Sequence, residues 1–245
     1  MDRARISDIA HADHPIRSPL DDRSVAALLD HALPRGDERV LDLGCGGAEW
    51  LLRALTTRPR AYAEGVDVSA GALARARRSA DERGVGDRLV LHRQDAAIFA
   101  AARQYDVVVC VGSTHALGGL LPTLDAARGH LAPGGRILVG DGYWSGTPTR
   151  EAVDMLGDLA DLATTVERVA AAGWTPRYGH VSTRAELDAY EWACWGSLAA
   201  WALDHPDDPD RADALATAAE RRTEWLRGYR DVFGFVSLVL GRTPE

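Results

Sequence analysis

The chain has 245 residues, of which 46% are apolar and 26% are charged, close to the usage of globular proteins and enough to bury a sizeable core. This composition excludes a disordered or fibrous chain. The formal net charge is −8 at pH 7, and the arginines are interleaved with acidic residues. We therefore expect no nucleic-acid partner, because such a partner requires a basic surface.

The cysteines and the apolar runs limit the class of protein further. Cys45, Cys110 and Cys194 are far apart and form no CxxC pair, so we expect neither disulfides nor a bound metal. The N-terminal stretch has no apolar signal-peptide core, and no apolar run approaches the ~20 residues of a membrane helix. We expect a cytoplasmic protein without a membrane partner, and the abundance of Ala, Arg, Gly and Asp is typical of GC-rich bacterial coding.

Short apolar runs alternate with helical stretches along the chain, which is the pattern of βαβ units with a parallel sheet. The first predicted element is a helix in the N-terminal segment. Ser18, Pro19 and Asp21 have the order of a capping box with proline at the first helical position. The helix that follows is expected to bury its large aliphatic residues, which are Leu20, Val25, Leu28, Leu29 and Leu33.

Five runs predict parallel strands, and several of them are nearly unbroken in apolar residues, as expected of central strands that are covered on both faces. These strands are expected at Arg39–Leu43, Ala61–Val68, Leu89–Gln94, Asp106–Val111 and Arg136–Gly140. The stretches between and after them have helical patterns. The helices are expected at Glu49–Thr56, Ala70–Arg83, Gly119–Leu131 and Asp154–Ala172. Pro133, Gly134 and Gly135 predict a turn before the fifth strand.

After the fifth strand the regular alternation loosens. We expect a sixth strand at Thr175–Ser182 and a final strand at Val232–Gly241, with helices at Arg184–Asp204 and Arg211–Arg230 between them. These two helices predict an insertion that covers the site. The expected parts are residues 1–38 as an N-terminal segment with a cap helix, 39–183 as the α/β core, 184–231 as the insertion and 232–245 as the final strand of the core sheet.

The first helix of this insertion is apolar nearly all round. One face is expected to carry Leu187, Tyr190, Cys194, Leu198 and Trp201, whereas Trp192 and Trp195 point elsewhere. Such a helix must be covered on two sides, by core on one and by a ligand, a partner or a second helix on the other. The alternative that all these rings are core residues stays open.

The strongest motif is a strand that runs into a glycine turn and then a helix, VLDLGCGGAEW over Val40–Trp50. Gly44 and Gly46 allow the backbone to come into contact with a ligand, as in sites for NAD, FAD or S-adenosylmethionine. Asp42, two residues before the first glycine, decides between them. A carboxylate there would repel a pyrophosphate and attract the ammonium and sulfonium groups of S-adenosylmethionine.

Two further acids follow the next strands in the expected register. Asp67 ends the second strand, where a carboxylate can accept both ribose hydroxyls of a nucleoside. Asp95 ends the third strand and can accept from the exocyclic amine of adenine, although a role as helix N-cap alone stays open. We include the residues after these acids, Val68 and Ala96, in the predicted cofactor site.

Together these motifs resemble the class I S-adenosylmethionine-dependent methyltransferases, small-molecule type. The resemblance covers roughly Val40–Tyr143 and is carried by VLDLGCGGAEW, GVDVS, HRQDAA, YDVVVCVGSTHALGG and LAPGGRILVGDGYW. It implies an α/β Rossmann-like fold with a seven-stranded, mostly parallel sheet, an antiparallel last strand and helices on both faces. It also implies S-adenosyl-L-methionine at the carboxyl ends of the first strands and S-adenosyl-L-homocysteine as product. Cys45 is common in the family's turn and is counted with the cofactor site.

One position departs from the family's turn, which commonly reads G-x-G-x-G. Ala48 stands at the third position, with Gly47 before it. Because a methyl group is small, we expect a slightly adjusted loop with the site retained.

The loops after the fourth and fifth strands carry the predicted acceptor side. Gly112 and Ser113 are expected beside the cofactor, and His115 is the first candidate for a general base because an imidazole has a pKa near ~6.5. Binding of substrate or bracing of the loop is the alternative for His115. Asp141 could orient His115 or hold a polar acceptor, and Tyr143, followed by Trp144, could form a wall of the acceptor cavity or have only a packing role.

Four residues outside these motifs are weaker candidates: His11, His14, His180 and Tyr190. They would reach the site only if the N-terminal segment and the insertion fold over it. A surface or packing role is the alternative for each.

The resemblance implies methyl transfer to an O or N nucleophile of a small-molecule acceptor, as in specialised metabolism. A protein that binds the cofactor without methylating is the main alternative, and Asp42 argues against an NAD-dependent oxidoreductase. The identity of the acceptor, the atom that is methylated, the need for a base and a homodimeric state stay open.

Overall fold

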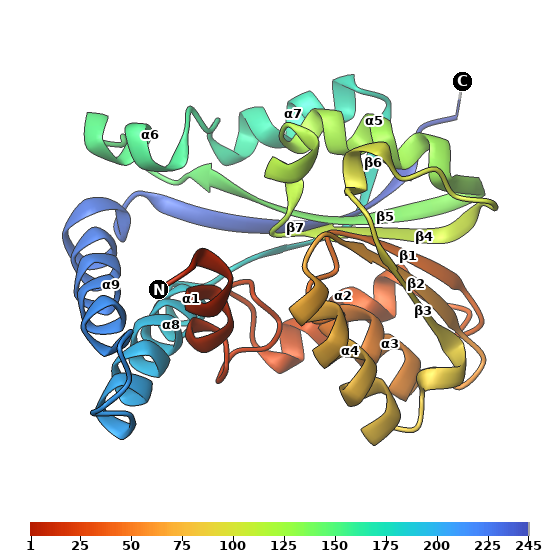
Figure 1. Ribbon diagram of the computed structural model, residues 1–245. Helices are drawn as coiled ribbons and strands as arrows, with labels where there is room; N and C mark the ends of the chain where they lie inside the picture. Colours follow the sequence, from red (N-terminus) through yellow and green to blue (C-terminus); the bar gives the residue numbers. More distant parts are fainter. Residues whose placement is uncertain (245) are drawn as a thin grey trace. The chain divides into compact units, whose positions relative to one another are not determined.

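The computed structural model describes residues 1–244, apart from the side chains of residues 3 and 4, and its central element is a seven-stranded sheet (Figure 1). Along the sheet the strands lie in the order β3-β2-β1-β4-β5-β7-β6. The strands are β1 Arg39–Leu43, β2 Tyr62–Asp67, β3 Leu89–Arg93, β4 Tyr105–Val111, β5 Leu131–Trp144, β6 Trp174–Val181 and β7 Phe233–Arg242.

Pairing in this sheet is parallel except at its far end. β1 pairs in parallel with β2 and β4, β2 with β3, and β4 with β5, whereas β7 runs antiparallel to β6. The predicted Rossmann-like fold with an antiparallel last strand is therefore confirmed. The strand order changes direction at β1, because β2 and β3 lie on one side of it and β4 and β5 on the other. Such a change leaves a crevice at the carboxyl ends of β1 and β4, where ligands bind in sheets of this kind.

The residue contacts divide the chain into two compact units. The sheet unit comprises Asp21–Asp141, Ala163–Val181 and the chain from Val236 onward, and the helical unit comprises Met1–Leu20, Gly142–Leu162 and Ser182–Phe235. Each unit is built from segments that are distant in the sequence.

Helices cover both faces of the sheet within the sheet unit (Figure 1). One face carries α2 Asp22–Ala32, α3 Glu49–Thr57 and α4 Ala70–Glu82, and the other carries α5 Leu120–His130 and α7 Leu162–Ala171. Short 3-10 turns lie at η1 Gly86–Arg88, η2 Ala96–Ile98 and η3 Thr114–Leu117. The central strands are buried on both sides, which explains why they read as unbroken apolar runs.

The start of α2 differs from the prediction. Its N-cap is Asp21, whose carboxylate accepts from the Ser24 amide at 2.7 Å. The hydroxyl of Ser18 instead donates to the Ile16 carbonyl at 3.2 Å, so the predicted capping box at Ser18 is wrong. An aspartate caps as well as a serine does, and here the acid lies directly before the amides that need a partner.

The strand β5 is much longer than the predicted Arg136–Gly140. Its pairing with β4 shifts register between Tyr105 and Val107, which face Leu131 and Arg136 respectively. The intervening residues form a bulge in which Gly134 has φ +76°. The predicted Pro-Gly-Gly turn therefore exists as an irregularity within one strand.

The single helix predicted over Asp154–Ala172 is two helices, α6 Arg150–Leu156 and α7. Gly157 follows α6 with φ +89°, a backbone conformation that glycine adopts readily and that ends a helix. Gly157 could have predicted this break in the helix. The apolar pattern continues on both sides of the glycine and therefore indicated one helix.

The helical unit contains α1 Arg3–Ala10, α6, α8 Arg184–Asp204, α9 Arg211–Thr223 and the π-helical turn η4 Glu224–Tyr229. Within it α8 packs against α9 and against α1. The bounds of α8 agree with the prediction, and Thr183 with Glu186 forms a capping box at its start, with distances of 2.8 and 3.2 Å. The second predicted helix changes to π-helical geometry at Glu224 and ends at Tyr229. Trp195 is buried, whereas Trp192 is exposed.

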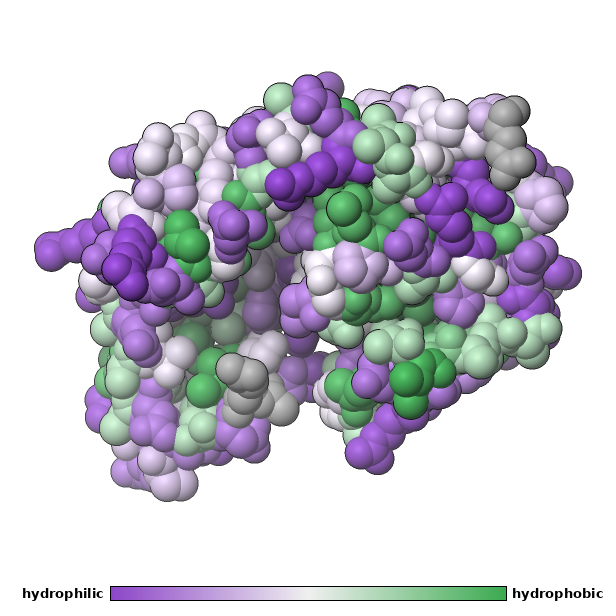
Figure 2. Space-filling model, turned by 90° about the horizontal axis from the view of Figure 1, so that it is seen from above, coloured by the Kyte–Doolittle hydropathy of each residue, from purple (hydrophilic) through white to green (hydrophobic). Residues whose placement is uncertain are grey.

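On the face seen in Figure 2, hydrophobic residues form separate patches between hydrophilic ones. Within residues 1–244, no helix combines the length and the apolarity that crossing a bilayer requires.

Candidate functional site

The turn between β1 and α3 has a backbone that requires glycine. Gly44 has φ +81° and Gly46 has φ +53°. A Cβ on Gly44 would lie 2.6 Å from the Cβ of Ser113, which is too close for any side chain. The amides of Gly44 and Cys45 both donate to the Val66 carbonyl, at 2.9 and 3.0 Å, so the turn is fixed against the end of β2.

Ala48 shows how the departure from the family's glycine pattern is accommodated. It is the N-cap of α3 and has φ +58°, in the left-handed region where glycine is favoured. Its amide donates to the Cys45 carbonyl at 2.7 Å. Alanine keeps the shape of the turn here at a cost of about 1 kcal/mol, because its Cβ crowds the backbone in this conformation.

Asp42 is a buried carboxyl group one residue before the end of β1. Within residues 1–244 we find no hydrogen bond or ion pair to its carboxylate. Burial, and to a lesser degree the charge of Asp67, raises the pKa of Asp42 to about 8. A buried carboxyl group without a partner is unfavourable, and a cationic group beside it would restore the charged form. The turn is therefore suited to a positively charged ligand.

Asp67 connects the turns that follow β1 and β2. One carboxylate oxygen accepts from the Gly46 amide and the other from the Ser69 amide, each at 2.8 Å. Each oxygen keeps a further lone pair, so Asp67 can still accept two hydroxyl groups from a ligand. Ser69 caps α4 by accepting from the Ala72 amide at 3.2 Å.

The end of β3 combines an acid with exposed aliphatic side chains. Asp95 caps the turn η2 by accepting from the Ala97 amide at 2.9 Å, and Ala96 is buried. Val68, which follows Asp67, is 64% exposed, and Ile98 is 71% exposed. The sequence did not predict a role for Ile98. Exposed aliphatic residues beside hydrogen-bonding acids provide the surface that a planar, apolar ring such as adenine requires.

The loop after β4 is tied to the neighbouring strands. Gly112 has φ +74°, and its amide donates to the Gly140 carbonyl at 3.2 Å. The Ser113 hydroxyl donates to the Leu43 carbonyl at 2.9 Å and lies 3.3 Å from the Cys110 sulfur. The side chain of Ser113 thus braces the loop against the end of β1.

His115 and Asp141 lie at the same edge of the sheet. His115 is exposed in η3, just beyond the end of β4, and Asp141 follows Gly140, which pairs with Val111 in β4. Their strands are adjacent and parallel, so the structure brings these two residues to neighbouring positions at the carboxyl edge.

Known proteins share both the sequence and the fold of this chain. A family described as a methyltransferase domain matches residues 41–137. The uncharacterized protein YjhP of Escherichia coli strain K12 is 30% identical over 244 residues, which covers 96% of this chain and 97% of that protein. A crystal structure of an S-adenosylmethionine-dependent methyltransferase from Geobacter sulfurreducens, in complex with S-adenosylhomocysteine, is 26% identical with a TM-score of 0.89 and covers 97% of this chain and 98% of that one. The corresponding complex from Thiobacillus denitrificans is 27% identical with a TM-score of 0.88, covering 99% and 100%. The chain belongs to the class I S-adenosylmethionine-dependent methyltransferases.

In this methyltransferase Tyr143 and Trp144 belong to the helical unit. Tyr143 is buried, and its hydroxyl would lie 2.6 Å from a Cβ placed on Gly234. Burial raises the pKa of the Tyr143 hydroxyl. Trp144 lies edge-on to Phe233, with ring centroids 6.3 Å apart. These contacts give both aromatic residues packing partners on β7 within their own unit.

Three of the four weaker site candidates, His11, His14 and Tyr190, lie in contact with one another in the helical unit. The Tyr190 hydroxyl and the His11 Nε2 are 3.0 Å apart, and the His14 ring lies edge-on to Tyr190. The His11 Nδ1 donates to the Ser7 carbonyl at 2.7 Å, so Nε2 accepts from Tyr190. Burial lowers the pKa of His11 to about 4, so its ring is neutral at pH 7. His180 lies elsewhere, on β6 in the sheet unit opposite Ser237.

A partly buried ion pair that the sequence did not predict lies beside this group. Glu191 on α8 accepts from the Nε and Nη2 atoms of Arg221 on α9, at 2.9 and 3.1 Å. The Arg221 guanidinium also lies over the ring of Tyr190, 5.7 Å from its centroid. An acid in an otherwise apolar stretch of α8 was the available signal, but its partner is 30 residues away in the sequence.

Proposed function

We propose that this methyltransferase binds S-adenosylmethionine at the turns after β1, β2 and β3 and transfers its methyl group to an O or N nucleophile of a small molecule. The observation that carries the proposal is the buried carboxyl group of Asp42, for which residues 1–244 provide no hydrogen bond or ion pair, beside a turn in which Gly44 has no room for a side chain. When bound, S-adenosylmethionine supplies an electrophilic methyl group on a sulfonium.

The residues of the sheet unit suit distinct parts of that molecule. Asp42 offers its carboxylate to the ammonium, directly or through a water, and Asp67 accepts from the ribose hydroxyls. Gly44 and Gly46 leave the backbone open to close approach, and the adjacent Cys45 packs beneath the turn. We assign the adenine to an edge formed by Val68, Asp95 and Ala96, and the region of the methyl group to Gly112 and Ser113.

His115 is the residue that we propose as general base, with Asp141 orienting it or holding a polar acceptor. An imidazole can take the proton of a hydroxyl or ammonium nucleophile as the methyl group moves, a contribution of about 10²–10⁴-fold in rate. Positioning of the nucleophile supplies the larger part of the acceleration. The acidic chain, with its net charge of −8, supports a small-molecule acceptor over a nucleic acid.

Calorimetric titration with S-adenosylhomocysteine tests the cofactor part of the proposal. We expect binding by the wild-type protein, weaker binding by Asp42→Asn, and unchanged binding by Asp125→Asn, a matched control whose exposed acid lies on α5. Retention of a nicotinamide dinucleotide with no affinity for S-adenosylhomocysteine would contradict the proposal.

Transfer of a radiolabelled methyl group into a cell extract tests the reaction. We expect label in the small-molecule fraction, and we expect His115→Ala to lower the rate while affinity for S-adenosylhomocysteine stays unchanged. Tight cofactor binding without any transfer would instead indicate a protein that binds the cofactor for another purpose. An unchanged rate in His115→Ala would remove His115 from the mechanism.

A further inference from the structure

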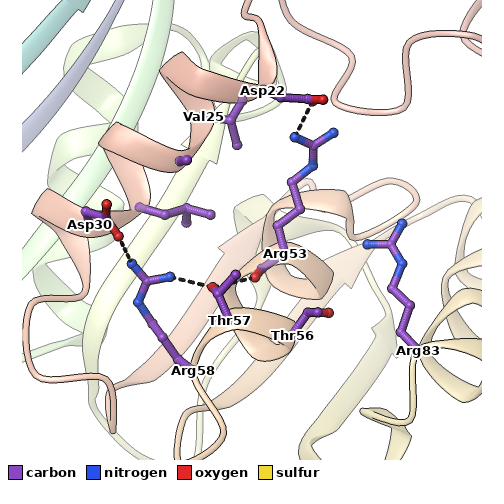
Figure 3. Close-up of a pocket in the computed structure, with 10 residues that line it drawn as sticks. Asp22, Val25, Asp30, Arg53, Thr56, Thr57, Arg58 and Arg83 are labelled. Atoms are coloured by element: carbon purple, nitrogen blue, oxygen red, sulfur yellow. Dashed lines mark hydrogen bonds and ion pairs between the residues drawn. The ribbon is translucent and has the colours of Figure 1, made fainter.

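A cavity of the sheet unit lies between α2 and α3 (Figure 3). It encloses about 540 Å³, which is within the usual size of small-molecule sites. Its floor is formed by Val25 and Leu29 of α2, both nearly inaccessible to solvent, with the exposed Ala26 at its rim. The glycine turn and Asp67 do not line it. The cavity is therefore separate from the proposed cofactor site.

Three arginines line this apolar cavity, and one of them has its hydrogen bonds committed to the fold. Arg58 donates to Asp30 at 2.7 Å, to the Leu33 carbonyl at 3.2 Å and to the Thr57 hydroxyl at 2.8 Å. Figure 3 shows this side chain held at the end of the cavity between Asp30 and Thr57. Arg58 therefore has a structural role.

The other two arginines share one buried acid. Glu49, whose side chain is 10% exposed, accepts from the Arg53 Nε at 2.8 Å and from the Arg83 Nη2 at 2.8 Å. The further partner of Arg53 is Asp22, at 2.6 Å from Nη1, and the Asp22 side chain is 90% exposed. Figure 3 shows Arg53 extended toward Asp22 at the mouth of the cavity and Arg83 entering from the end of α4. Two guanidinium groups thus face one mostly buried carboxylate and one exchangeable, solvated carboxylate.

We propose that this cavity binds an organic carboxylate with an apolar body. The carboxylate takes the place of Asp22 on Arg53 and pairs with the outer donors of Arg83, which a planar guanidinium presents in a fork that matches a carboxylate. The apolar body lies along α2, against Val25, Ala26 and Leu29. Replacement of Asp22 costs little, because the ion pair of an exposed carboxylate is weak in water.

The cavity lining has a charged part and an apolar part, and this combination determines the class of ligand. An inorganic anion would pair with the arginines and leave the apolar part of the cavity unfilled, and a neutral apolar molecule would leave the charges of Arg53 and Arg83 without a new partner. A molecule that has both features satisfies both parts of the cavity.

Titration of the full chain with octanoate, followed by calorimetry, tests the proposal. We expect saturable binding of octanoate and at least tenfold weaker binding of 1-octanol, which lacks the charge, and of acetate, which lacks the chain. Arg53→Gln and Arg83→Gln should each weaken octanoate binding at least tenfold. Arg78→Gln, at an exposed position of α4, should leave it unchanged and serves as the matched control.

Two further measurements keep the test decisive if an arginine variant folds poorly. Ala26→Trp fills the mouth of the cavity without removing an ion pair, and it should abolish octanoate binding while S-adenosylhomocysteine still binds. Saturation with S-adenosylhomocysteine should not displace octanoate. Equal affinity for octanoate and 1-octanol, unchanged binding in all three variants, or displacement by S-adenosylhomocysteine would each overturn the proposal.

Discussion

Asp42 in the sheet unit and Glu191 in the helical unit are both buried carboxyl groups, but their surroundings differ. Arg221 donates twice to Glu191, at 2.9 and 3.1 Å, whereas no partner for the Asp42 carboxylate is found among residues 1–244. Burial raises the pKa of both groups, to about 8 for Asp42, and for Glu191 the guanidinium opposes that rise. A paired buried charge is compensated within the fold, and removal of its partner is costly. An unpaired one is tolerated where a ligand completes it.

The contrast also holds for a second carboxylate of each unit. In the helical unit Asp188 accepts from Arg230 at 2.7 and 2.8 Å and from the Trp225 indole at 3.0 Å, so its acceptor capacity is used within the unit. In the sheet unit Asp67 accepts from two amides and keeps lone pairs for a ligand. Substitutions in the two units should therefore have different readouts: unfolding in the helical unit and ligand affinity in the sheet unit.

The largest effect is expected from Arg221→Met, which leaves Glu191 buried without its partner. We expect a loss of about 2–4 kcal/mol in the free energy of unfolding, somewhat below the value for a fully buried pair because Arg221 is partly exposed. Denaturant unfolding measures it. The neighbouring Arg222→Met is exposed and should cost little, and Glu191→Gln combined with Arg221→Met should recover part of the loss. Equal stability of the two arginine variants would show that the pair contributes nothing.

Asp67→Ala should weaken S-adenosylhomocysteine binding about 100-fold, which corresponds to about 2.7 kcal/mol. The substitution removes the two contacts that hold Gly46 and Ser69 in place, and with them the two ribose hydrogen bonds that we propose for Asp67. Calorimetry measures the affinity. Wild-type affinity in this variant would overturn the assignment of the ribose, and Asp81→Ala on the exposed side of α4 is the control.

Asp42 should release a proton when S-adenosylhomocysteine binds. With a pKa of about 8 the free carboxyl group is mostly protonated at pH 7, and the ammonium of the ligand favours the ionised form. We expect a release of about one proton per ligand, seen as a dependence of the calorimetric enthalpy on the ionisation enthalpy of the buffer. The dependence should be absent in Asp42→Asn. The same dependence in both proteins would assign the proton to another group.

The features that the sequence predicted well are those that depend on local pattern. β1 at Arg39–Leu43 and α8 at Arg184–Asp204 have the predicted bounds, since an apolar run or a helical period ends there at glycine, threonine or proline signals. The errors come from competition between neighbouring signals. Asp21 caps α2 in place of Ser18, and Gly157 interrupts an apolar pattern that otherwise continues.

The candidate site was predictable in its location and less so in its electrostatics. Because parallel strands place their carboxyl ends at one edge, Asp42, Asp67 and Asp95 could be predicted to share one site from their positions at or just after the ends of strands. The burial that protonates Asp42 depends on the covering helices and could not be read from spacing. The packing of Tyr143 on Gly234 and the pair of Glu191 with Arg221 join segments far apart in the sequence. The role of residues 184–231 as a cover stays a prediction.

The smallest effect concerns His11, whose response to pH has the opposite sign to that of Asp42. Burial lowers the pKa of His11 to about 4, while an unfolded histidine titrates near 6.5, so the unfolded state binds more protons between these values. The contribution of His11 is fully present above pH 6.5 and is lost as the pH falls toward 4. We expect wild-type stability to drop by about 1–2 kcal/mol more than that of His11→Gln between pH 7 and pH 5, measured by denaturant unfolding.

Asp42 acts in the other direction, because its folded-state pKa is raised and stability is lost as the pH rises toward 8. Parallel pH profiles for wild type and His11→Gln would mean that the ring near Tyr190 is solvated in solution, and the contrast between the partnered Glu191 and the Asp42 carboxyl group would then not extend to this residue.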